Sequence, residues 1–193
     1  MSNLQQRMQQ AFAALQSGNP ALAEQICRQI LAETGDTPDA LFLLGMISLQ
    51  TGRLPQAEQW FARLVAVDPA NAAAHNNLGG VLFQLKRHQQ AIDSYDRAIH
   101  CKPDYAGAYN NRGAALNELG RHQEAADSCA TALRMAPDNA EAHNNLGNAL
   151  QGLERYAEAL QSYQRALTIR PDYADAHNNR GNALRLLGRQ DEA

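Results

Sequence analysis

The apolar residues of this chain follow the period of a helix, and the helices themselves recur at a longer fixed interval. In residues 157–169 the apolar side chains fall at i, i+1, i+4, i+7 and i+8, which predicts an amphipathic helix with one packing face. These residues are Ala159, Leu160, Tyr163, Ala166 and Leu167. The surrounding stretch, residues 140–173, recurs along the chain with a period of 34 residues. A fixed period of this size is typical of a solenoid of stacked repeats.

Each repeat predicts two helices, at repeat positions 2–14 and 18–30, when position 1 is placed at Pro38, Ala72, Ala106, Ala140 and Ala174. Position 32 is proline in every complete repeat and ends the second helix. Position 15, between the two helices, is glycine in three repeats, where a left-handed C-cap is expected. Lys86 and Glu154 fill the other two and are expected to adopt the same conformation at a cost of about 1 kcal/mol each.

The pattern divides the chain into an array over residues 38–193 and a degenerate N-terminal capping repeat over residues 1–37. The array consists of residues 38–71, 72–105, 106–139, 140–173 and an incomplete unit, 174–193. In the cap, helices are predicted over residues 4–17 and from residue 20 to about Thr34. Because the last unit stops inside its second apolar stripe, we expect the sequence to be the N-terminal part of a longer protein. The alternative is a short protein whose last helix is covered by another chain.

The repeat resembles the tetratricopeptide repeat, a unit of 34 residues with conserved types at six positions. In residues 140–173 all six agree with that pattern: Leu146, Gly147, Ala159, Tyr163, Ala166 and Pro171. The resemblance is strong over residues 38–193 and weak over residues 4–37. It implies an all-α fold, a right-handed superhelical solenoid of antiparallel helix pairs that binds proteins or peptides.

Composition and charge narrow the function classes. The formal net charge of −3, from 17 basic and 20 acidic residues, gives no electrostatic reason to expect nucleic acid. The N-terminus lacks the apolar core of a secretory signal, and no run of 18 apolar residues would cross a membrane. We therefore expect a cytoplasmic protein without membrane contact. The three cysteines lack metal-site spacing, and Cys27 and Cys129 are expected to be buried thiols.

One side of each first helix cannot belong to the core, because positions 3, 4, 7, 8, 10, 11 and 14 already form the apolar side. The other side, positions 2, 5, 6, 9, 12 and 13, is rich in asparagine and is expected to be exposed. By resemblance to the family it lines a concave groove. An amide both donates and accepts hydrogen bonds, which suits it to the main chain of an extended peptide. The groove residues predicted are Asn76, Asn77, Asn110, Asn111, Asn117, Asn144, Asn145, Asn148, Asn178, Asn179 and Asn182. The alternative is that these amides only bond to neighbouring helices.

The asparagines at position 6 are also similar to those of the O-linked N-acetylglucosamine transferases, whose repeats precede a glycosyltransferase domain. They are Asn77, Asn111, Asn145 and Asn179, and Leu43 interrupts the row. That resemblance implies a substrate-recruiting role for a larger enzyme. No nucleophile, base and orienting residue can be assembled from this sequence, so we expect no catalysis by this chain itself.

Remaining features predict contacts rather than chemistry. An apolar N-terminal contact patch is expected at Phe42, Leu43, Met46 and Leu49, with Met8, Phe12 and Leu15 as further members. It would bind a partner or a second copy, unless the first helix covers it. The uncapped C-terminal end is a second place where copies could join. His75, His143 and His177, at position 4, are expected to be packed rather than to bind zinc, and no cofactor or metal is predicted. Arginines in the inter-helix turns are expected to be solvated or bonded to helix-end carbonyls.

Overall fold

The computed structural model describes residues 3–189 and contains eleven α-helices and no β-strand within that range. The helices follow one another in antiparallel pairs, so the predicted all-α solenoid of helix pairs is confirmed. The chain divides into two compact units, unit 1 (Met1–Arg87) and unit 2 (His88–Ala193), which are described separately below.

Unit 1 contains five helices, each of which contacts the next, and its first and third helices also contact each other. They are α1 (Asn3–Gln16), α2 (Pro20–Thr34), α3 (Pro38–Gln50), α4 (Leu54–Val67) and α5 (Ala72–Gln84). One apolar cluster joins α1, α2 and α3, and a second joins α3, α4 and α5. The capping repeat is therefore packed as a helix pair, with α1 one residue earlier than expected.

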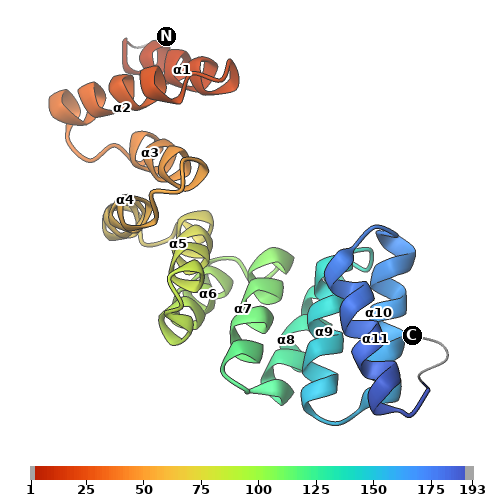
Figure 1. The fold of residues 1–193 in the computed structure, drawn as a ribbon. Coiled ribbons are helices and arrows are strands. Elements are labelled where there is room, and N and C mark those ends of the chain that lie inside the picture. Colours follow the sequence, from red (N-terminus) through yellow and green to blue (C-terminus); the bar gives the residue numbers. More distant parts are fainter. Residues whose placement is uncertain (1–2, 190–193) are drawn as a thin grey trace. The chain divides into compact units, whose positions relative to one another are not determined.

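Unit 2 contains α6 (His88–Cys101), α7 (Ala106–Glu118), α8 (His122–Met135), α9 (Ala140–Gly152), α10 (Tyr156–Ile169) and α11 (Ala174–Leu186). The first helices of its repeats, α7, α9 and α11, lie side by side, and the second helices α8 and α10 lie behind them (Figure 1). This arrangement brings the same repeat positions of three successive helices onto one face.

The glycine at position 8 lets the two helices of a repeat approach closely. A Cβ atom added at Gly147 would overlap the ring of Tyr163, and one added at Gly45 would overlap the ring of Phe61. In α7 the equivalent space, above Gly113, is filled by the Sγ atom of Cys129. Cys27 and Cys129 are fully buried, as expected. Burial raises the pKa of the Cys27 thiol to about 11 and that of Cys129 to about 12.

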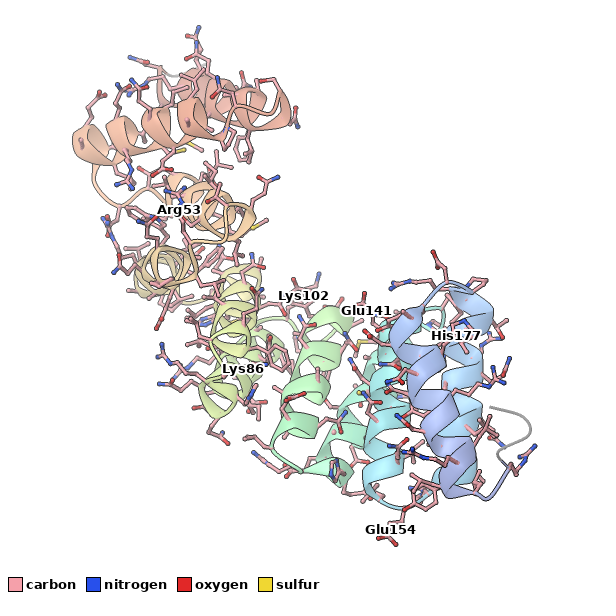
Figure 2. All side chains as sticks on the ribbon, in the orientation of Figure 1. Arg53, Lys86, Lys102, Glu141, Glu154 and His177 are labelled. Carbon is pink, nitrogen blue, oxygen red and sulfur yellow. The ribbon has the colours of Figure 1, made fainter. Side chains whose placement is uncertain are left out.

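The turn after the first helix of each array repeat uses a left-handed residue, whether or not that residue is glycine. Gly52, Gly120 and Gly188 have φ angles of 71–72°, and Lys86 and Glu154 have φ angles of 62° and 61°. Figure 2 shows Lys86 and Glu154 in their turns. The prediction that these two non-glycine residues keep the glycine conformation is confirmed, and each carries the strain that a Cβ atom brings there.

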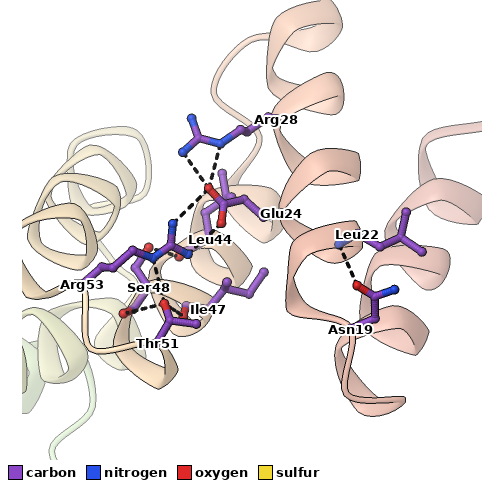
Figure 3. A network of polar contacts seen from close by, with 9 residues as sticks. All are labelled: Asn19, Leu22, Glu24, Arg28, Leu44, Ile47, Ser48, Thr51 and Arg53. Atoms are coloured by element: carbon purple, nitrogen blue, oxygen red, sulfur yellow. Dashed lines mark hydrogen bonds and ion pairs between the residues drawn. The ribbon is translucent and has the colours of Figure 1, made fainter.

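Four of the turn arginines are partly solvated, as expected, and they also bind carboxylates, which the sequence did not predict. In unit 1, Arg53 donates to Glu24 of α2 at 2.7 Å, and Arg28 shares that carboxylate (Figure 3). Hydrogen bonding from Arg53 holds the pKa of Glu24 below its usual range. Arg87 donates to Glu58 of α4 at 2.7 Å. In unit 2, each arginine pairs with a glutamate three residues later, in the first turn of the following helix: Arg121 with Glu124 and Arg155 with Glu158.

Candidate functional site

The asparagines at position 6 link successive first helices of unit 2. The Nδ2 atom of Asn145 in α9 donates to Oδ1 of Asn110 in α7 at 3.0 Å. The Nδ2 atom of Asn179 in α11 donates to Oδ1 of Asn144 in α9 at 3.1 Å and to Oδ1 of Asn148 at 3.0 Å. These hydrogen bonds form an amide ladder that holds α7, α9 and α11 in register.

Position 5 lies between neighbouring first helices and is not exposed where a following helix covers it. Asn110 and Asn144 are only 5% and 4% exposed, so the expectation that they line an open face is wrong. Assigning positions from one isolated helix missed the contact with the next first helix. Asn178, the corresponding residue of α11, is exposed, and Asn76 in α5 is partly buried.

A tyrosine that sequence reasoning treated only as core reaches this face with its hydroxyl group. The ring of Tyr163 is buried against Gly147, and its hydroxyl donates to Oδ1 of Asn148 at 2.9 Å and to Oε1 of Gln151 at 3.3 Å. Burial raises the pKa of Tyr163, which keeps the hydroxyl protonated and able to donate. The signal available in the sequence was the polar residues one and four positions after the glycine that the ring covers.

Hydrogen-bond partners fix which end of each amide turns inward. Asn145 and Asn179 use Nδ2 toward the preceding helix, and within the described residues their Oδ1 atoms accept no hydrogen bond. Asn148 does the reverse, because its Oδ1 accepts from Tyr163 and Asn179. Asn182 likewise accepts from Arg185 at 3.3 Å through Oδ1. Asn145 and Asn179 therefore present acceptors at position 6, and Asn148 and Asn182 present donors at position 9. At Asn111 the Oδ1 atom accepts from Asn110.

The remaining predicted asparagines make related contacts. Asn117 in α7 donates to the backbone carbonyl of Asn145 at 2.9 Å, and Asn110 donates to Asn111 at 3.4 Å. In unit 1, Nδ2 of Asn77 in α5 lies 3.7 Å from Sδ of Met46 in α3. This contact also joins position 6 of one first helix to position 9 of the preceding one. Asparagine at position 6 therefore has a packing role in both units, which was the alternative interpretation of the sequence.

The predicted apolar contact patch is largely covered. Leu43 is 2% exposed and belongs to the cluster that contains Met8, so its assignment to an exposed patch is wrong and the first helix covers it. Phe42 packs edge-on against Phe61 with ring centroids 6.0 Å apart, and Leu49 packs against the same cluster as Phe61. Met46 remains exposed.

The histidines at position 4 bond to the proline that ends the preceding repeat. The Nε2 atoms of His75, His143 and His177 lie 3.0, 2.9 and 2.8 Å from the carbonyl oxygens of Pro69, Pro137 and Pro171. They fix the link between one repeat and the next. His75 is buried as expected, but His143 is partly exposed and His177 exposed, so their predicted place on the core side is wrong. Among residues 3–189, no cluster of histidine, cysteine and carboxylate side chains could hold a metal ion.

Family models of the tetratricopeptide repeat match almost the whole chain. The matches cover residues 106–139 and 140–173, 14–75, 61–106, and 162–193. The chain belongs to the tetratricopeptide repeat family. Such repeats generally mediate protein–protein interaction. None of the helices in the described part of this tetratricopeptide protein is long and apolar enough to span a bilayer.

Solved structures of other tetratricopeptide proteins have the same fold. PilF of Pseudomonas aeruginosa superposes with a TM-score of 0.82 at 20% identity, over 97% of this chain and 86% of PilF. YrrB, described as a tetratricopeptide protein with an unusual peptide-binding site, gives 0.78 at 21% identity, over 89% of each chain. MamA gives 0.78 at 24% identity, over 85% of this chain and 96% of MamA. No curated protein sequence matches the chain.

Proposed function

We propose that this chain is a non-catalytic interaction module and that the asparagine face of unit 2 binds an extended segment of a partner protein. The asparagine face comprises the partly exposed amides of α7, α9 and α11: Asn111, Asn117, Asn145, Asn148, Asn179 and Asn182. One observation carries the proposal. The amides of Asn145 and Asn179 are held with Nδ2 inward, so that the Oδ1 atoms are oriented before any ligand arrives.

Pre-oriented amides favour main-chain recognition. Every residue of an extended peptide except proline offers one N–H donor and one carbonyl acceptor, whatever its side chain. The acceptors at position 6 would take peptide N–H groups, and the donor of Asn148 would reach a peptide carbonyl. Neighbouring first helices lie roughly 8–10 Å apart, a distance that about three extended residues span. Because the amides already have fixed orientations, binding costs little side-chain entropy.

The family supports this use, since its repeats mediate protein–protein interaction and YrrB is described as peptide-binding. The row of asparagines in α7, α9 and α11 would equally hold an acceptor polypeptide for a glycosyltransferase domain. That form of the proposal and self-association of the chain stay predictions. Binding of an acceptor polypeptide would use the same geometry as binding of any other partner segment. In self-association, the segment bound would belong to a second copy of the chain.

The direct test uses short linear peptides selected on the full chain by phage display, with affinity measured by fluorescence anisotropy. Combined replacement of Asn111, Asn145 and Asn179 by alanine should weaken binding by tenfold or more, a loss of about 1.4 kcal/mol or greater. Gln123→Ala removes an exposed amide from the second helix α8 and should leave the affinity unchanged.

A packing control separates lost binding from lost stability. Asn110→Ala breaks the hydrogen bond that orients Asn145 but keeps all three amides that the triple variant removes. Its peptide affinity should fall about threefold, less than in the triple variant, at temperatures where circular dichroism shows full helicity. Equal affinity of the triple variant and the unmodified chain would refute the proposal.

A further inference from the structure

Unit 1 has a small pocket on the exposed side of α1, and no residue of α5 lines it. Three apolar residues one turn apart, Leu4, Met8 and Phe12, form one wall, and Thr37 and Asp39 at the start of α3 form the other. Gln5 and Gln9 complete the lining, and the volume is about 310 Å³. This size is near the lower end for ligand pockets, which suits one or two side chains rather than a whole cofactor.

The apolar wall is open to solvent at Phe12. The Phe12 side chain is 43% exposed, although Met8 beside it is 7% exposed and anchors α1 in the core. A single exposed apolar residue is ordinary on a protein surface. An exposed aromatic ring that lines a pocket over a buried methionine differs, because a ligand group there would contact apolar atoms on several sides.

A carboxylate without a cation partner stands at the rim of the pocket. The arginines of unit 1 are paired with other acids: Arg7 with Glu33, Arg28 and Arg53 with Glu24, Arg63 with Asp36, and Arg87 with Glu58. Asp39 forms no ion pair with any residue that the structure describes. Its place in the first turn of α3 offsets part of its charge, and a ligand cation would offset the rest.

We propose that this pocket binds a partner segment in which a leucine, methionine or phenylalanine stands next to a lysine or arginine. The apolar side chain would lie against Leu4, Met8 and Phe12, and the basic side chain would pair with Asp39. This pocket is independent of the asparagine face. The pocket would recognise side chains of the bound peptide, whereas the asparagine face is proposed to bind the peptide's main chain.

The test again uses phage-displayed short linear peptides selected on the full chain. Enriched sequences should share an apolar residue beside a basic one. Phe12→Ala should weaken the binding of such a peptide about tenfold, because most of the apolar contact is lost. Asp39→Asn should weaken it about threefold at low salt and less at high salt, since the ion pair is near the surface. Leu22→Ala, which removes an equally exposed apolar side chain from α2, should have no effect.

The outcomes separate this inference from the proposed function. Apolar–basic peptides that bind Phe12→Ala with normal affinity would overturn the pocket, and their loss of affinity with the triple asparagine variant would leave the asparagine face standing. Apolar–basic peptides that lose affinity with Phe12→Ala but bind the triple asparagine variant normally would support the pocket. A library that yields no apolar–basic sequences overturns the pocket. So does self-association of the chain that Phe12→Ala abolishes, because the occupant would then be a second copy.

Discussion

In unit 1, Leu43 of α3 lies in the same apolar cluster as Met8 of α1, whereas in unit 2 the equivalent residue, Asn145 of α9, bonds to Asn110 of α7. Both contacts join position 6 of one first helix to position 5 of the preceding one. The apolar contact needs only complementary shape, and it buries Leu43 completely. The amide contact has a direction, and it leaves a polar atom for another molecule. One repeat pattern therefore supports a closed face and an open polar face.

The turn arginines differ between the units in a parallel way. Arg53 and Arg87 of unit 1 reach a glutamate on the preceding second helix, so each joins two repeats. Arg121 and Arg155 of unit 2 reach a glutamate three residues ahead, and Arg121 also donates to Gln89 of α6 in the preceding repeat at 3.3 Å. The turn arginines of unit 1 thus form ion pairs between repeats. In unit 2 the amides act beside ion pairs from other positions, such as Arg112 with Asp96.

The largest effect on stability is expected when the asparagine found at position 6 in unit 2 replaces the leucine at position 6 in α3 of unit 1. Leu43→Asn should lower the free energy of unfolding of unit 1 by about 3 kcal/mol or more, because a buried amide replaces a packed leucine. Trp60, the only tryptophan in the chain, lies in unit 1 and reports its urea unfolding by fluorescence. Adding Met8→Asn supplies an acceptor and should recover about 1 kcal/mol. An unchanged Trp60 transition in Leu43→Asn would mean that this contact does not stabilise unit 1.

A smaller effect is expected from the matching change in unit 2. Asn145→Ala leaves the buried Oδ1 of Asn110 without its donor and should cost about 1–3 kcal/mol. Hydrogen exchange of α7 and α9 should become faster. The urea midpoint of the Trp60 transition should shift less than it does in Leu43→Asn. Asn178→Ala, at an exposed position 5, is the matched control and should stay within about 0.5 kcal/mol. Equal costs for Asn145→Ala and Asn178→Ala would remove the ladder as a structural element.

The turns should respond alike in both units and so mark what the units share. Lys86→Gly in unit 1 and Glu154→Gly in unit 2 should each stabilise the chain by about 1 kcal/mol, because glycine adopts positive φ without strain. Thermal unfolding followed by circular dichroism measures both gains. A loss of stability in either variant would show that the side chain makes a favourable contact that outweighs the strain.

The smallest effect concerns acid stability. The pKa of Glu24 is lowered in the folded state, so its contribution is present above its unfolded pKa and is lost as the pH falls through the lower folded value. Glu24→Gln should therefore cost less than about 1 kcal/mol at neutral pH and flatten the fall in Trp60-monitored stability below pH 4.5. Glu158→Gln, whose pair is local and exposed, should leave stability unchanged. A larger loss of stability in Glu158→Gln than in Glu24→Gln would contradict the view that the arginine–glutamate pair of unit 1 contributes more than that of unit 2.

The periodic features of the fold were predictable from the sequence. The helix pairs followed from the 34-residue period, and the positive φ angles of Lys86 and Glu154 followed from the glycines at equivalent positions. These predictions hold because each depends on one repeat and its own geometry.

The features that were missed depend on contacts between repeats. The burial of Asn144 and of Leu43 requires the neighbouring first helix, which no single helical wheel contains. The hydroxyl of Tyr163 was assigned to the core because the ring is apolar, although its reach extends to Asn148. Arg53 could bond to a carbonyl, to water or to Glu24, and only the packing of α2 against α3 selects the carboxylate.

The most direct test of the asparagine face is a main-chain scan of one peptide that binds the full chain. Each peptide nitrogen is methylated in turn, which removes an N–H donor and keeps the side chain, and each side chain is separately replaced by alanine. If Asn145 and Asn179 accept main-chain N–H groups, methylation at two or more sites should weaken binding about tenfold or more, and most alanine changes should matter less. Tolerance of methylation at every site, with binding lost through single side chains, would contradict the account.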